Sequence, residues 1–138
     1  MDAHLLEFLS LLLRWLHFIA GVAWIGSSFY FIWLDNSLEA PEPGSENAKK
    51  GVSGDLWAVH GGGFYNPQKY AVAPGTLPPR LHWFKWEAYT TWLSGTALLV
   101  VVYWIRAQTM MIDSAQMPLT TWQAIGIGAA SMVGAWVV

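Results

Sequence analysis

Two ionisable residues, Arg14 and His17, stand inside an almost uninterrupted apolar stretch that runs from residue 5 to residue 34. An ionisable group at membrane depth costs about 2.5 kcal/mol or more unless it faces protein, water or a cofactor. Because a neutral imidazole binds iron well and titrates near physiological pH, His17 can be an axial haem ligand or a proton-handling group. Alternatively, it is hydrogen-bonded to a neighbouring helix. Arg14 can hold an anion through its forked guanidinium or extend toward the nearer membrane interface.

A second group of candidate residues surrounds a glycine triplet, with His60 directly before it and Lys69 shortly after it. Glycines such as Gly62 and Gly63 let a backbone approach a ligand closely, and the rings of Phe64 and Tyr65 can stack on a planar molecule. The alternative is an ordinary turn. No Gly-Lys-Ser/Thr follows, which excludes a Walker loop.

A third group, His82, Lys85 and Glu87, opens the second apolar region. These residues can supply acid/base or anion-binding functions. The alternative is an interfacial belt in which Trp83 and Trp86 anchor the helix at the headgroups and Lys85 lies among them. No zinc spacing such as HExxH occurs in the sequence.

The element that carries Arg14 and His17 is predicted to be a transmembrane helix over residues 5–34, because about 20 helical residues cross a bilayer. Steps of three and four residues from Arg14 reach His17, Gly21 and Trp24, so these residues share one face of the helix. We expect this face to pack against protein and the opposite, aliphatic face to contact lipid.

The composition agrees with a membrane protein, since 54% of the 138 residues are hydrophobic and only 12% are charged. We predict an all-α, polytopic membrane helix bundle with about three transmembrane helices, at residues 5–34, 81–106 and 119–138. The connection 35–80 is too long to be structureless, and a short β-hairpin or a re-entrant turn is expected around its glycine triplet. A net charge of -2 gives no case for nucleic-acid binding.

Lysine and arginine concentrate in the segment 35–80, which the positive-inside rule places in the cytoplasm with the N-terminus in the periplasm. The third apolar run ends without a cap or a polar flank. We therefore expect the sequence to be the N-terminal part of a longer protein.

Three motifs, taken in order, resemble a known family. LRWLHFIAGVAWIGSSFYFIWLD, LWAVHGGGFYNPQKY and PRLHWFKWEAYTTWLSGTALL are similar to the N-terminal membrane domain of the bacterial membrane-bound urate oxidases. The resemblance covers nearly the whole chain, 1–138. It implies a multi-pass inner-membrane enzyme of purine catabolism that oxidises urate to 5-hydroxyisourate and passes electrons to a fused C-terminal cytochrome c domain carrying haem c. That domain is missing from this sequence, so the fragment alone is expected to be inactive.

The resemblance also suggests roles for the residues above. Urate is planar and anionic, so it calls for stacking rings, a cation and a proton acceptor. Expected substrate-binding residues are Arg14, Gly62, Gly63, Phe64, Tyr65, Lys69 and Lys85. Expected catalytic residues are His60, His82 and Glu87.

The first-helix motif, LHFIAGVAWIG, is also similar to those of small haem-binding membrane oxidoreductases and of copper-resistance membrane proteins. This resemblance supports haem b at His17 as a secondary hypothesis, and no metal besides its iron is expected. Two rival functions stay open: a haem-b electron-transfer protein without substrate chemistry, and a component of a purine or metal transporter.

Overall fold

The computed structural model describes residues 3–137, so residues 1, 2 and 138, which belong to the predicted domain 1–138 and the predicted helix 119–138, lie outside it. The chain forms two compact units, a helical unit of residues 3–24 and 85–137 and a sheet unit of residues 25–84. The long helix α1 (Ala3–Ser37) contributes to both units.

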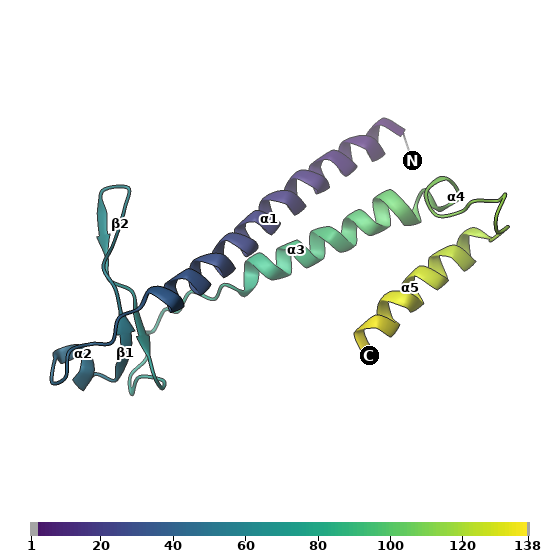
Figure 1. Cartoon of the computed structure of the whole chain (residues 1–138). Coiled ribbons are helices and arrows are strands. Elements are labelled where there is room, and N and C mark those ends of the chain that lie inside the picture. Colours follow the sequence, from purple (N-terminus) through teal and green to yellow (C-terminus); the bar gives the residue numbers. More distant parts are fainter. Residues whose placement is uncertain (1–2, 138) are drawn as a thin grey trace. The chain divides into compact units, whose positions relative to one another are not determined.

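In the helical unit, the N-terminal part of α1 runs antiparallel to α3 (Lys85–Leu98), as Figure 1 shows. A segment with wider i→i+5 turns, η1 (Leu99–Trp104), continues α3, and Ile105 N donates to Val100 O at 3.0 Å. The short helix α4 (Ala107–Met110) and helix α5 (Thr121–Val137) follow. The predicted second helix is therefore wrong at its start, because residues 81–84, which follow two prolines, are not helical.

In the described part of the chain, α1 is the one helix long and apolar enough to cross a membrane. Its 35 residues include an 18-residue apolar window that is only 6% buried. Leucines, which favour helix formation, are frequent in the first half of α1.

The sheet unit holds two antiparallel strand pairs. Strand β1 (Val52–Asp55) pairs with β4 (Gln68–Tyr70), and between them β2 (Ala58–His60) pairs with β3 (Gly63–Tyr65). The two strands that the sequence predicted on either side of the glycine triplet are thus present as β2 and β3, with His60 opposite Gly63.

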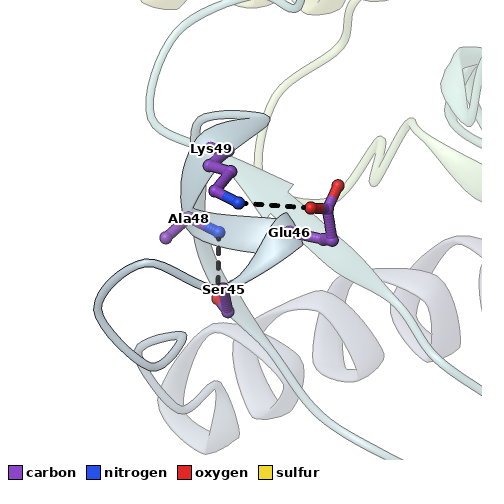
Figure 2. Close-up of polar contacts among 4 residues, drawn as sticks. All are labelled: Ser45, Glu46, Ala48 and Lys49. Carbon is purple, nitrogen blue, oxygen red and sulfur yellow. Dashed lines mark hydrogen bonds and ion pairs between the residues drawn. The ribbon is translucent and has the colours of Figure 1, made fainter.

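The segment between α1 and β1 is tied to the strands by polar contacts. Helix α2 (Glu46–Lys49) begins at Ser45, whose Oγ accepts a hydrogen bond from Ala48 N at 3.2 Å (Figure 2). Lys49 Nζ lies 3.4 Å from Glu46 Oε1, a solvent-exposed pair whose contribution is at most about 1 kcal/mol. The carboxylate of Asp55 makes further contacts, because it accepts hydrogen bonds from the side-chain amides of Asn47 at 3.2 Å and Asn66 at 3.1 Å.

Candidate functional site

His17 makes a polar contact between two helices of the helical unit. Its Nδ1 lies 3.1 Å from the backbone oxygen of Thr91 and 3.1 Å from Ser94 Oγ, both on α3. Ser94 is only 3% exposed, so this contact is in the interior of the helix pair. The face of α1 that carries His17 and the buried Ala20 therefore packs against protein, as predicted.

The partners of His17 determine which of its ring nitrogens carries the proton. A backbone oxygen can only accept, and Ser94 uses its own hydroxyl proton to donate to Thr90 O at 2.7 Å. Nδ1 of the neutral imidazole is therefore the protonated nitrogen and donates to α3. The lone pair of Nε2 is left to accept a proton or to bind a metal.

Gly95 allows His17 to lie close to α3. A Cβ atom at this position would be 3.1 Å from His17 Cε1, which is tighter than ordinary van der Waals contact. Ser94 belongs to a polar face that the sequence predicts to point into the bundle, but Gly95 has no signal in the sequence. Its role depends on its place on α3 opposite the histidine, and this requires the pairing of the two helices to be known.

His17 also lines a cavity of about 430 Å³ in the helical unit, which we call the His17 cavity. Its walls come from α1, α3, the start of η1 and α5. They are formed by His17, Trp24, Ala88, Thr91, Trp92, Gly95, Thr96, Leu99 and Met132. The hydroxyls of Thr91 and Thr96 donate to backbone oxygens one turn earlier in α3. The cavity therefore presents the imidazole and the thioether of Met132 in a mostly apolar wall.

Arg14 does not share the packed face with His17, and this prediction was wrong. The residue is exposed on a neighbouring face of α1, where it lines a second cavity of about 310 Å³ with Leu11, Trp15 and Phe18. The rings of Trp15 and Phe18 meet edge to face with their centroids 6.5 Å apart. A guanidinium and two aromatic rings are thus gathered on one exposed surface, which we call the Arg14 surface (Leu11, Arg14, Trp15 and Phe18).

The glycine triplet forms the tip of the β2–β3 hairpin in the sheet unit. Gly61 and Gly62 have positive φ angles of 57° and 80°, as a two-residue type I′ turn requires. His60, Phe64 and Tyr65 are exposed, and the Tyr65 ring lies against Gly63, where a Cβ would be 3.1 Å from its hydroxyl oxygen. The turn explains Gly61 and Gly62 without a ligand.

Substitution at this turn provides the first prediction. Gly62→Val is expected to lower the free energy of opening the hairpin by about 1–2 kcal/mol, because a side chain at positive φ is strained. Gly61→Asn is the matched control, since Asn-Gly is the preferred pair for this turn. Hydrogen exchange of the backbone amides in residues 56–70 of the full protein measures the difference. Equal exchange in the two variants would contradict the strain argument.

Lys69, on β4, forms an ion pair with Asp35 at the end of α1, with Nζ 2.8 Å from Oδ1. Both side chains are about half exposed. Lys69 is a predicted urate-binding residue, whereas Asp35 has no predicted role. In this structure the ammonium is already neutralised by a carboxylate, which makes it a weaker attractor for an anion.

The third predicted group is divided between the two units. His82, in the sheet unit, lies edge to face on Phe84 with centroids 4.5 Å apart. Lys85 Nζ lies 5.4 Å from the ring centroid of Trp86 in α3, a cation–π contact, and Glu87 is half-buried in the same first turn of the helix. The lysine and tryptophan contact fits the interfacial belt as well as it fits an anion site.

Comparison with known proteins concerns the whole chain rather than one of these groups. No curated protein and no solved structure matches it. A family model described as urate oxidase N-terminal matches residues 3–138. Because that match spans almost all of the sequence, the chain belongs to the urate oxidase N-terminal family.

Proposed function

We propose that this chain is the N-terminal part of a membrane-embedded enzyme that oxidises urate to 5-hydroxyisourate and passes the electrons to a cytochrome c. The observation that carries the proposal is the family match over residues 3–138. The exposed apolar surface of α1 supports the membrane location.

The surface of α1 is suited to lipid or to further helices. Phe29 is 67% exposed and Ile19 is 59% exposed, and leaving such side chains in water forfeits about 1.5–3 kcal/mol each. We place α1 across the bacterial inner membrane, with the basic segment 35–80 on the cytoplasmic side and the N-terminus in the periplasm. In this proposal α3 with η1, and then α5, follow as further spans of a polytopic bundle.

The stoichiometry of urate oxidation determines how many electrons the acceptor must take. Urate and one water give 5-hydroxyisourate, two protons and two electrons, with the new oxygen coming from water. A cytochrome c takes one electron, so two are reduced for each urate. The protein must bind an anionic purine and accept protons as the electrons leave.

Arg14 is our candidate for holding the urate anion. A guanidinium forms paired charge-assisted hydrogen bonds with planar anions, and the rings of Trp15 and Phe18 can contact the purine. A cavity of about 760 Å³ in the sheet unit suits urate less, because Glu39, Glu42 and Asp55 line it and would repel an anion. Of the predicted proton acceptors, Glu87 belongs to the helical unit together with Arg14, whereas His60 and His82 belong to the sheet unit.

The test follows urate loss and cytochrome c reduction in membranes that contain the full protein. We expect two cytochromes reduced per urate, and ¹⁸O from labelled water in the product. Oxygen taken from O₂, or no urate-dependent reduction, would overturn the proposal. Urate uptake without any product would favour a transporter instead.

A further inference from the structure

We propose that the His17 cavity binds a b-type haem, with His17 Nε2 and Met132 Sδ as the two axial ligands. This proposal rests on the proposed function only for the role of the haem in carrying electrons from urate. The binding site itself is argued from the geometry of the helical unit. Imidazole and thioether are a recurrent pair of haem ligands and give the iron a raised reduction potential.

The hydrogen bonds of His17 leave one ring nitrogen able to bind iron. Its Nδ1 proton is held by the Thr91 backbone oxygen and Ser94 Oγ, each at 3.1 Å, so the Nε2 lone pair is available to a metal. Ligating histidines almost always donate their other ring N–H to a backbone oxygen, a carboxylate or water, which fixes the orientation of the ring. Gly95 leaves the space that this orientation needs.

The size and shape of the cavity indicate what kind of ligand it can hold. A bare metal ion does not require about 430 Å³, since a water molecule occupies only about 30 Å³ of liquid. Trp24 and Trp92 line the same cavity and offer flat aromatic surfaces to a planar macrocycle. No Lys or Arg lines it, which disfavours urate itself as the occupant.

The position of Met132 makes it the candidate for the second ligand. Among the residues that line the cavity, it is the one other side chain that can bind iron, and it comes from α5, whereas His17 comes from α1. Met132 is 58% exposed, so its flexible thioether is not committed to core packing. Ligands from different helices are typical of cofactor sites in helix bundles.

The experiment measures haem in the purified full protein. Extraction with acidified acetone removes non-covalent haem b and leaves covalent haem c, so the two are quantified separately. We expect about one extractable haem per protein, and at least a tenfold loss of it in His17→Ala. Protein without extractable haem, or with copper in its place, would overturn the proposal.

Met132→Leu tests the second ligand without removing the first. We expect this variant to keep its haem, to lose the low-spin spectrum and the near-infrared band of methionine–iron ligation, and to have a lower reduction potential. Met117→Leu, in the exposed connector before α5, is the matched control and should retain the wild-type spectrum. An unchanged spectrum in Met132→Leu refutes the role of Met132. Because these spectra need no urate, they separate failure of the haem site from failure of urate oxidation.

Discussion

Arg14→Ala is expected to lower kcat/KM for urate about a hundredfold, which corresponds to ~2.7 kcal/mol. The guanidinium is the exposed cation of the Arg14 surface, and a paired hydrogen bond to an anion is among the strongest contacts a side chain can make. Arg14→Lys should recover only part of the loss, because an ammonium keeps the charge without the fork. Steady-state urate oxidation in membranes gives the values.

The control for Arg14 is Arg106→Ala, an exposed arginine between η1 and α4 that lies outside the Arg14 surface. We expect its kcat/KM to stay within about twofold of the wild-type value. If both arginine variants lose activity equally, general charge and not a specific contact is responsible. If Arg14→Ala keeps full activity, urate binds elsewhere.

A second large effect is expected from acidic residues on the exposed aliphatic side of α1. Ile19 and Ile25 are 59% and 54% exposed near the middle of the helix. Each aspartate there opposes insertion by about 2.5–3.5 kcal/mol, so the double variant Ile19→Asp/Ile25→Asp should prevent α1 from spanning the membrane. A reporter fused to the N-terminus should then move from the periplasm to the cytoplasm.

The matched control, Ile19→Leu/Ile25→Leu, keeps the apolar surface and should leave the reporter in the periplasm. Other spans can hold the protein in the membrane, so the location of the N-terminus is a sharper measure than total membrane recovery. A reporter that stays periplasmic in the aspartate variant would show that this face of α1 is covered by protein or lines water.

The sequence predicted those parts of the fold that depend on local signals. Helix α1 has a long apolar run, and the β2–β3 hairpin has a glycine pair at its turn. The start of α3 was predicted four residues too early, because residues 81–84 have the apolar, aromatic composition of the helix that follows, and composition alone does not mark where the helix begins.

The candidate site was less predictable, because it depends on which helices meet. A helical wheel places Arg14 and His17 within about 60° of each other, so it cannot tell which of them faces α3. Met132 lies 115 residues after His17 in the chain, and nothing local relates the two. The i→i+5 turns of η1 also had no signal in its apolar sequence, LVVVYW.

Because of the wide turns of η1, the geometry of the His17 cavity depends on the number of residues between α3 and α5. Such a segment corresponds to one residue inserted into an α-helix. Removing a single residue from Leu99–Trp104 would restore regular α-helical turns and rotate everything beyond by about 100°. The length of η1 therefore determines the rotation of α4 and α5 about the helix axis. This rotation also sets the direction from which Met132 approaches the imidazole of His17.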